Sequence, residues 1–467
     1  MATSAANATM YFEQFYLGCL AHASYLLGSD GEAVVVDPQR DVDIYLQAAA
    51  EHGLKIKHVF ETHLHADFVS GHKELARRTG ATIYIGAKAK AHFPHVPLLD
   101  GVEVQFGRAK ISALETPGHT PESVCLLVTD LEKSPRPWAV LTGDTLFLGD
   151  VGRPDLSPNH TPQMLAGQLY DSLHKKLLTL PDDVVVYPAH GAGSLCGRNM
   201  RAERSSTIGT ERLTNYALQI ATRDEFIRQL TENLPARPEY FLKDAEINRE
   251  GAAALDELPR LRSLSAEEVK SLMGQGVPAL DVRPGEDFAA GHVPGSINIA
   301  LSGQFATWAG TVLGPEARPI LIADADEQIA EAQIRLARVG LDAGQGYLVG
   351  GVKGWQSTGY PLVKTAQMNV EELQRGLCSA EISVLDVRRE PERNAGHVEG
   401  SAWWALDRFK AELPAITRSQ PVAVHCKSGY RSMVACSLLQ RAGYENVVNV
   451  TGGFDAWEKS GAPVVKG

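Results

Sequence analysis

The chain has 467 residues, of which 44% are hydrophobic and 22% are charged, a balance that predicts about three globular domains. Its formal net charge of −11 argues against nucleic acid or an anionic membrane as a partner, and no apolar run approaches the roughly 20 residues that a membrane span requires. The N-terminus does not resemble a secretion signal, and six scattered cysteines are too few for a disulfide scaffold, so we expect a cytoplasmic protein.

The first half of the sequence alternates β-branched runs with helical patterns, which predicts layered α/β structure. Strands are expected at 32–38, 58–63, 81–86, 139–144 and 184–190. Helices are expected at 42–53, 72–80 and 211–234. Most of the predicted strands end in a polar or metal-binding type of residue, as buried strands do when they deliver chemistry to the loops at one edge of a sheet.

The second half contains an internal repeat. "ALDVRPGEDFAAGHVPGSINIA" from Ala279 matches "VLDVRREPERNAGHVEGSAWWA" from Val384, and "LVGGVKGW" at 348–355 matches "VTGGFDAW" at 450–457. Two units of about 100 residues therefore stand in tandem. We predict three domains, at 1–250, 255–365 and 367–467.

Four separated segments of the first half carry residues that can bind a metal. They are His63, His65 and Asp67; His119; Asp144; and His190. A single histidine is more often a hydrogen-bonded structural residue, and an Asp after a strand is often a turn former. Four such segments, three of which close a β-type run, instead indicate one shared site. Imidazole and carboxylate donors without an accompanying cysteine suit zinc or iron.

The order of these motifs resembles the metallo-β-lactamase fold over roughly residues 10–250. "THLHADFVSG", "ETPGHTPES", "GDTLFLGDVGRPD" and "YPAHGAGSLCG" resemble its persulfide dioxygenase branch more closely than its glyoxalase II branch. The resemblance implies an αββα sandwich that binds one Fe(II) per chain. The implied ligands are His63, His119 and Asp144, a facial triad with three positions open for a thiolate-like substrate and dioxygen. The groups expected to orient these ligands and bound water are His65, Asp67 and His190.

Phe68 stands where dinuclear relatives have a histidine that helps to hold a second metal. Phenylalanine has no donor atom, so the second metal position loses a ligand while the first keeps its set. The alternative is that Phe68 only packs against the core and the site still holds two metals. Arg153 and Arg198 are candidates for binding a carboxylate of the substrate's thiol carrier, and each is equally well explained as a surface ion pair.

In the last repeat, "QPVAVHCKSGYRSMVACSLLQRAG" predicts a strand, a tight loop and a helix that begins near Tyr430. Cys426 lies at the turn, so backbone N–H groups at a helix N-terminus and the Arg431 guanidinium would surround its sulfur. Such a field favours a thiolate and a persulfide anion. The alternative reading is a structural cysteine. The residues expected to form the persulfide-binding loop are Lys427, Ser428, Gly429 and Tyr430.

This loop, with the upstream "DVR" and the downstream "GGFDAW", resembles a rhodanese domain over residues 367–467. The resemblance implies that Cys426 is the nucleophile that carries sulfur. The first repeat departs from the pattern, because Asp324 stands at the position of Cys426 in a loop that is one residue shorter and has no Arg. We expect residues 255–365 to form an inactive rhodanese-like α/β unit that acts as a spacer, an oligomer contact or part of a shared cleft.

These observations predict a sulfide-detoxification enzyme. The metal centre would oxidise a small-molecule thiol persulfide with O2 to sulfite, and Cys426 would interconvert persulfide plus sulfite with thiosulfate. Two alternatives are a dinuclear-zinc thioester hydrolase similar to glyoxalase II and a sulfur-relay protein. Glutathione, coenzyme A and bacillithiol are all open as the thiol carrier. By resemblance, we expect a homo-oligomer.

Overall fold

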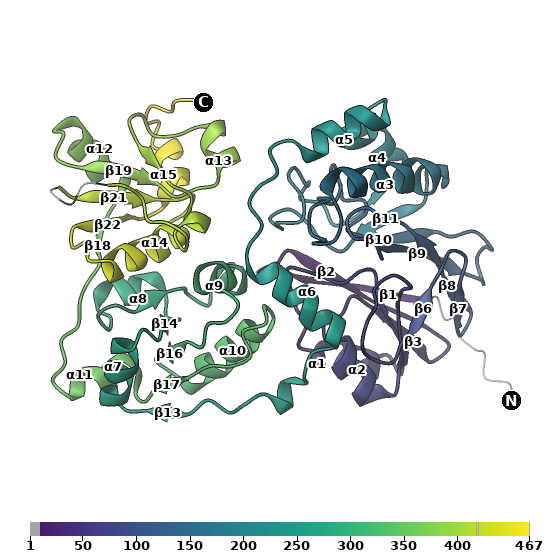
Figure 1. The fold of residues 1–467 in the computed structure, drawn as a ribbon, viewed down its shortest axis with the longest axis horizontal. Helices are drawn as coiled ribbons and strands as arrows, with labels where there is room; N and C mark the ends of the chain where they lie inside the picture. The colour runs from purple at the N-terminus through teal and green to yellow at the C-terminus, as the bar shows by residue number, and fades with distance from the viewer. Residues whose placement is uncertain (1–9, 417, 419, 467) are drawn as a thin grey trace, which may run out of the picture. The chain divides into compact units, whose positions relative to one another are not determined.

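The computed structural model describes residues 10–416, 418 and 420–466, which form two compact units. Figure 1 shows the elements of each. The first unit runs to Leu258 and includes Ala337–Gly340, and the second consists of Pro259–Leu336 and the residues from Leu341 onward. The three predicted domain boundaries remain predictions. Among the described residues, no helix has the length and apolar character needed to cross a bilayer.

The first unit contains two six-stranded sheets whose strands follow one another in nearly sequential order. The first sheet consists of β1 (Tyr11–Leu17), β2 (His22–Ser29), β3 (Glu32–Val36), β4 (Lys55–Glu61), β5 (Thr82–Gly86) and β6 (Val96–Leu98). The second consists of β7 (Glu103–Phe106), β8 (Ala109–Glu115), β9 (Val124–Asp130), β10 (Ala139–Gly143), β11 (Val185–Pro188) and β12 (Ser206–Thr207).

Alternation of side chains along the strands explains why the sheets pack face to face. Val34 belongs to a buried cluster that includes Ile111 and Leu126 of the second sheet. Its neighbour Val35 faces the other way and packs with Tyr45 and Leu75 in the helical layer. Because successive strand residues point to opposite faces, one valine run serves two cores. The predicted αββα sandwich is confirmed.

Helices cover the outer faces of both sheets (Figure 1). On the first sheet they are α1 (Asp43–Glu51) and α2 (His72–Thr79), and on the second they are α3 (Pro162–Lys175), α4 (Ile208–Thr214) and α5 (Arg223–Thr231). The unit also contains α6 (Tyr240–Glu250) and the 3-10 turns η1 (Leu177–Thr179), η2 (Tyr216–Gln219) and η3 (Leu255–Glu257). The single helix predicted at 211–234 is wrong, since the segment forms α4, η2 and α5. Side chains of Asn215 and Thr222 accept hydrogen bonds from the backbone two or three residues ahead, so each starts a new helix.

The second unit contains two five-stranded parallel sheets with the same strand order. The first consists of β13 (Ser263–Leu264), β14 (Ala279–Asp281), β15 (Ile297–Asn298), β16 (Ile320–Ile322) and β17 (Gly346–Leu348). The second consists of β18 (Ala366–Met368), β19 (Ser383–Asp386), β20 (Ala402–Trp403), β21 (Val422–His425) and β22 (Val447–Val450). This shared topology is the structural form of the sequence repeat.

The helices of the second unit also come in two matching sets. The first set is α7 (Ala266–Gly274), α8 (Gly285–Ala290), α9 (Phe305–Leu313), α10 (Asp326–Ala337) and α11 (Gly351–Ser357). The second is α12 (Val370–Cys378), α13 (Glu390–Ala395), the 3-10 turn η4 (Leu406–Arg408), α14 (Tyr430–Arg441) and α15 (Gly453–Lys459). The helix predicted to begin near Tyr430 is α14, directly after the loop that carries Cys426.

Candidate metal centre and sulfur-transfer loop

Loops at the ends of several strands of the first unit gather the predicted metal ligands. His63 follows β4, Asp144 follows β10, and His119 lies between β8 and β9. Strands β8 and β10 both pair antiparallel with β9, so their carboxyl ends share one edge of the sheet. The fold thereby brings together three side chains that are far apart in the sequence.

The three donors are close enough to hold one ion. One donor atom from each of His63, His119 and Asp144 lies within 4.8 Å of the other two, and all three residues are buried. His119 Nε2 and His63 Nε2 lie 3.4 and 3.8 Å from Asp144 Oδ2. His119 Nε2 and Asp144 Oδ2 have no hydrogen-bond partner among the residues that the structure describes. Buried polar atoms are ordinarily paired, so this arrangement fits a metal ion.

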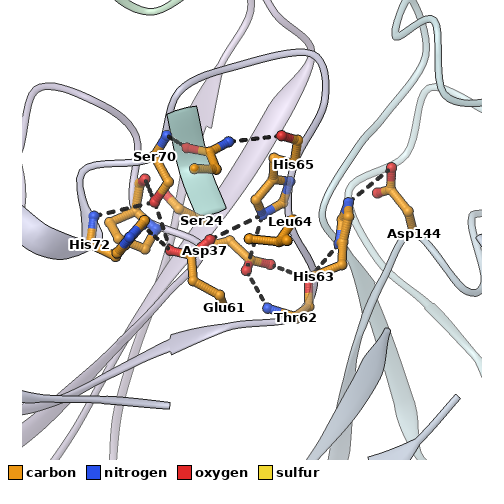
Figure 2. Close-up of polar contacts among 12 residues, drawn as sticks. Ser24, Asp37, Glu61, Thr62, His63, Leu64, His65, Ser70, His72 and Asp144 are labelled. Atoms are coloured by element: carbon orange, nitrogen blue, oxygen red, sulfur yellow. Dashed lines mark hydrogen bonds and ion pairs between the residues drawn. The ribbon is translucent and has the colours of Figure 1, made fainter. Parts of the chain in front are cut away.

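The other ring nitrogen of each histidine is already engaged. His119 Nδ1 lies 2.9 Å from the carbonyl oxygen of Arg153, which can only accept, so Nδ1 carries the proton and Nε2 keeps its lone pair. The Thr62 hydroxyl donates to Asp37 Oδ2 at 2.9 Å and therefore accepts from His63 Nδ1 at 3.0 Å (Figure 2). Both Nε2 atoms are thus left free for a metal.

Electrostatics gives these groups the protonation states that metal binding needs. Burial holds the pKa of His63 well below its ordinary value and also lowers the pKa of His119. Burial alone would raise the pKa of Asp144, but the charge and hydrogen bond of His190 hold it well below its ordinary value. Two neutral imidazoles and one carboxylate are the result, and a metal requires deprotonated ligands.

His190 is held between two carboxylates. Its Nδ1 lies 2.7 Å from Asp144 Oδ1 and its Nε2 lies 2.9 Å from Asp67 Oδ2. Although burial lowers the pKa of His190, these two carboxylates raise it well above its ordinary value. A ring that carries both protons donates to both carboxylates and so holds Asp144 in place. The supporting role of His190 stays a prediction.

The structure also brings together a second group of donors. His65, Asp67 and His190 have donor atoms within 4.8 Å of one another, and all are buried. Phe68 is fully buried beside them, with its ring centroid 4.4 Å from that of His65. The phenyl ring therefore occupies the neighbourhood of this second group without supplying a ligand atom.

Several residues of this neighbourhood were missed in the sequence. His22, at the start of β2, is buried with its ring 4.0 Å from that of Phe68. Asp37 and Glu61 lie beside His65, whose Nε2 is 3.2 Å from Asp37 Oδ1 and 3.7 Å from Glu61 Oε2 (Figure 2). Each stands at the end of a strand or the start of one, which was the available signal.

Cys196 is another buried neighbour of the centre. Its sulfur lies within 4.8 Å of donor atoms of Asp144 and His190. Burial, followed by the charges of Asp67 and Asp144, raises the pKa of the Cys196 thiol well above its ordinary value. A protonated thiol is a poor nucleophile and a poor metal ligand.

The two arginines considered for substrate binding both have protein partners. The Arg153 guanidinium donates to both carboxylate oxygens of Asp155 at 2.7 Å and to the carbonyl oxygen of Pro235 at 2.6 Å. Arg198 Nη2 donates to the carbonyl oxygens of Leu230 and Glu232. These contacts hold the surrounding loops, and a substrate role for Arg153 and Arg198 stays a prediction.

The loop after β21 surrounds the sulfur of Cys426 with hydrogen-bond donors. The backbone N–H of Gly429 donates to Cys426 Sγ over 3.1 Å, and the Ser432 hydroxyl lies 3.6 Å away. Gly429 has a φ of 106°, a backbone conformation that favours glycine. The residues at 427 and 428 are exposed, so the loop opens to solvent on that side.

Arg431 does not stand free at the sulfur. Its guanidinium makes two hydrogen bonds of 2.6 Å to the carboxylate of Glu392 on α13. Although burial raises the pKa of Glu392, the Arg431 guanidinium lowers it below its ordinary value. The charge of Arg431 is therefore largely matched by an acidic partner that the sequence did not reveal.

The equivalent loop of the first repeat has a different character. Asp324 is exposed, and its backbone N–H donates to Gln328 Oε1 at 3.0 Å. Helix α10 then begins at Asp326. A carboxylate therefore stands where the last repeat has a thiol, and the Gln328 side chain accepts from the backbone N–H groups of the loop.

Two family models match the chain: the metallo-beta-lactamase superfamily over residues 17–190 and the rhodanese-like domain over residues 265–358 and 369–460. The persulfide dioxygenase ETHE1 of Bos taurus is 33% identical over 225 residues, which are 45% of this chain and 77% of that protein. The chain belongs to the ETHE1 persulfide dioxygenase family. Two tandem rhodanese-like domains follow in the same chain, so both predicted resemblances are confirmed.

Two further proteins are similar to parts of the chain. A crystal structure of a metallo-beta-lactamase from Staphylococcus aureus matches with a TM-score of 0.65 and 32% identity, over 73% of this chain and 99% of that one. A hydroxyacylglutathione hydrolase of Francisella philomiragia is 33% identical over 177 residues, which are 38% of this chain and 65% of that protein. The N-terminal fold is thus shared with hydrolases.

Proposed function

We propose that the first unit is a persulfide dioxygenase with one Fe(II) per chain, and that the last rhodanese-like domain is a sulfurtransferase acting through Cys426. The observation that carries the proposal is the set of His63, His119 and Asp144 donors. Beside the neighbouring group of His65, Asp67 and His190 lies Phe68, whose ring cannot bind an ion. The ETHE1 relatives support the choice of persulfide as substrate. Together these activities would detoxify sulfide.

The proposed oxidation is RSSH + O2 + H2O → RSH + sulfite + 2H⁺. Iron, when bound, supplies the one-electron chemistry that dioxygen needs to react with a closed-shell sulfur compound. His63, His119 and Asp144 would hold the ion, and the buried carboxylates of Asp37 and Asp67 would offset positive charge nearby. His190 fixes the orientation of Asp144 by its 2.7 Å hydrogen bond.

Sulfur transfer would take place at Cys426. The Cys426 thiolate attacks the outer sulfur of the persulfide, and the carrier leaves as its thiolate with the electron pair of the broken S–S bond. Sulfite then attacks the same outer sulfur, so that thiosulfate forms and the Cys426 thiolate is regenerated. The N–H of Gly429, 3.1 Å from the sulfur, stabilises the negative charge at both stages.

Oxygen uptake tests the oxidation. Protein of measured metal content is mixed with a thiol persulfide in an oxygen-electrode cell, and sulfite is quantified in the same sample. We expect one dioxygen consumed for each sulfite formed, and activity in proportion to the iron content. An iron-loaded sample that consumes no oxygen with any persulfide would refute the proposal.

A dinuclear-zinc thioester hydrolase is the second candidate. The donor group His65, Asp67 and His190 and the Francisella relative favour it. Metal analysis distinguishes the two candidates, because one iron per chain supports the oxygenase and two zinc ions support the hydrolase.

A sulfur-relay protein is the third candidate, in which Cys426 passes persulfide to a protein acceptor. Cys426→Ser separates it from our proposal: we expect this variant to lose thiosulfate formation and to keep forming sulfite. Loss of oxygen uptake as well would show that the two sites do not work independently.

Two properties of the whole protein complete the proposal. All six cysteines are free thiols, which suits a reducing cytoplasm. The family resemblance supports a homo-oligomer, and sedimentation velocity measures its size.

A further inference from the structure

A cavity of about 330 Å³ lies beside the Cys426 loop in the second unit. Residues of both rhodanese-like repeats line it. The first repeat contributes Pro284, Gly285, Glu286, Asn298, Ala300 and Ser302, and the last contributes Gln367, Ser428, Gly429, Tyr430, Met433, Asn449, Thr451 and Gly452. The repeat without a cysteine therefore forms one wall of the space next to the reactive loop of the other.

Direct contacts fix this wall against the loop. The Tyr430 hydroxyl donates to the carbonyl oxygen of Ala300 at 2.8 Å, and the backbone N–H of Asn298 donates to the Ser437 hydroxyl at 3.0 Å. Phe288 and Met433 are buried in one cluster (α8 and α14 in Figure 1). The cavity is thus preformed by packing between the repeats.

The only formal charge on the residues that line the cavity is negative. Glu286, on α8, is the single charged residue among those that line the cavity. It is exposed, and its carboxylate makes no ion pair or hydrogen bond with any residue that the structure describes. The Arg431 guanidinium of the same loop is bound to Glu392. Apart from Glu286, the wall consists of amides, hydroxyls and apolar groups, so it favours a cationic group over an anionic one.

The size of the cavity limits what it can enclose. At about 330 Å³ it lies at the lower end of the roughly 300–1,000 Å³ that small-molecule sites span. An amino-acid or short peptide thiol is of this size. A thiol carrier that bears a nucleotide is larger and brings several phosphate charges toward Glu286.

We propose that this cavity binds the persulfide donor of Cys426, and that the donor is a small thiol whose ammonium group faces Glu286. The inference rests on the proposed sulfurtransferase activity and names its substrate class. Cys426 attacks the outer sulfur of the donor, the donor's S–S bond breaks, and the carrier departs as a thiolate that retains its ammonium group. The repeat without a cysteine then determines which persulfide donor binds beside Cys426.

Paired donors test the role of the ammonium group. Persulfidation of Cys426 is followed by intact-protein mass spectrometry with the persulfides of cysteine and N-acetylcysteine, which differ in that group, and with those of glutathione and coenzyme A. Cysteine and glutathione carry an ammonium group, and we expect the wild-type protein to show a lower KM for their persulfides than for those of N-acetylcysteine and coenzyme A. Glu286→Gln should raise KM for the two ammonium-bearing donors by about two- to fivefold, the range of an exposed ion pair, with kcat unchanged.

The controls separate charge from general damage. Glu267→Gln changes an exposed acidic residue of the same repeat that does not line the cavity, and it should leave every KM unchanged. Ser302→Trp fills the cavity from the first repeat and should raise KM for all donors. Equal KM values for cysteine and N-acetylcysteine persulfides would overturn the inference alone. Absence of sulfur transfer from every donor would overturn both the inference and the proposed sulfurtransferase.

Discussion

Thr62 connects a candidate metal ligand to a buried carboxylate. Its hydroxyl donates to Asp37 and accepts from His63 Nδ1, so it fixes the tautomer that leaves His63 Nε2 free. Asp37 also has a φ of 51°, a conformation that a non-glycine residue adopts at a local cost. The two hydrogen bonds that the Asp37 carboxylate accepts, from the backbone N–H and the hydroxyl of Thr62, offset this cost.

Replacing this hydroxyl tests its effect on the metal. Thr62→Val keeps the side-chain shape and removes the link, so we expect iron affinity to fall by about 10- to 100-fold, the usual effect of losing such a supporting contact. Competition with a chelator measures the affinity. Thr62→Ser is the matched control and should restore it. Equal affinities in the valine variant and the wild type would contradict this role for Thr62.

In our interpretation the chain binds one metal ion because Phe68 has no donor atom for a second. Phe68→His places an imidazole beside Asp67, whose Oδ1 is buried without a hydrogen-bond partner. We expect the zinc-loaded variant to bind two ions per chain and the wild type to bind one, as measured by elemental analysis after gel filtration. Phe68→Leu removes the ring without adding a donor and should bind one. Two zinc ions in the wild type would instead favour the hydrolase.

Local sequence motifs revealed some residues of the two sites and missed others. The candidate ligands could be found because each lies in a short motif. His22 stands alone before an apolar strand, and the backbone pairing that brings it next to His190 joins distant parts of the chain. Glu392 was missed for the same reason, since its partner Arg431 lies in a different motif. A single residue whose partner comes from a distant segment gives no local pattern.

At the scale of elements, the strand–loop–helix around Cys426 depends on one glycine. A Cβ at Gly429 would meet only backbone atoms at 3.6 Å or beyond, so space is available, and the φ of 106° is what a substituted residue would resist. Such a conformation costs a non-glycine residue on the order of 1–3 kcal/mol. The loop would relieve this strain by moving the Gly429 N–H away from the sulfur.

Gly429→Ala should therefore make Cys426 less reactive. We expect alkylation of Cys426 by iodoacetamide to slow by about tenfold, a factor that corresponds to roughly 1.4 kcal/mol. Peptide mass spectrometry resolves Cys426 from the other five cysteines. Gly274→Ala, at a helical glycine with open space around it, is the control and should not change the rate. An unchanged rate in Gly429→Ala would show that this N–H does not activate the thiol.

Elements were predicted best where the pattern was long and regular. The strands at 32–38 and 139–144 and the helix at 42–53 are β3, β10 and α1. The helix expected at 211–234 is interrupted because Asn215 and Thr222 cap the backbone within an otherwise helical composition. Side-chain capping competes with helix continuation, and composition averaged over the segment does not register it.

At the scale of the whole molecule, the repeat in the sequence predicted two similar units, and each contains a five-stranded sheet with the same strand order. A shared cleft was one of three roles left open for the first repeat, and the sequence could not select it, because the contacts between Tyr430 and Ala300 or between Phe288 and Met433 join non-equivalent positions. Internal similarity reveals the fold of each unit. The interface between units depends on surface residues that differ from one repeat to the other.

The stability of the full chain should depend on pH through His292 in the first repeat. His292 is buried, its ring stacks on Phe288 at 3.7 Å, and its Nδ1 lies 2.8 Å from the Phe288 carbonyl oxygen. Burial lowers the pKa of His292 from 6.5 to about 4. Between these values the unfolded chain binds the proton and the folded chain does not, so acidification favours unfolding.

The effect is absent well above pH 6.5 and grows as the pH falls, so that by about pH 4 the proton lowers the free energy of unfolding by about 3 kcal/mol. His292→Gln keeps a donor for the Phe288 carbonyl and removes the titration. Urea unfolding followed by tryptophan fluorescence at pH 7.5, 6.5, 5.5 and 4.5 compares the two proteins. We expect the wild type to lose more stability than the variant across this range, and identical pH dependence in both would exclude His292 as the cause.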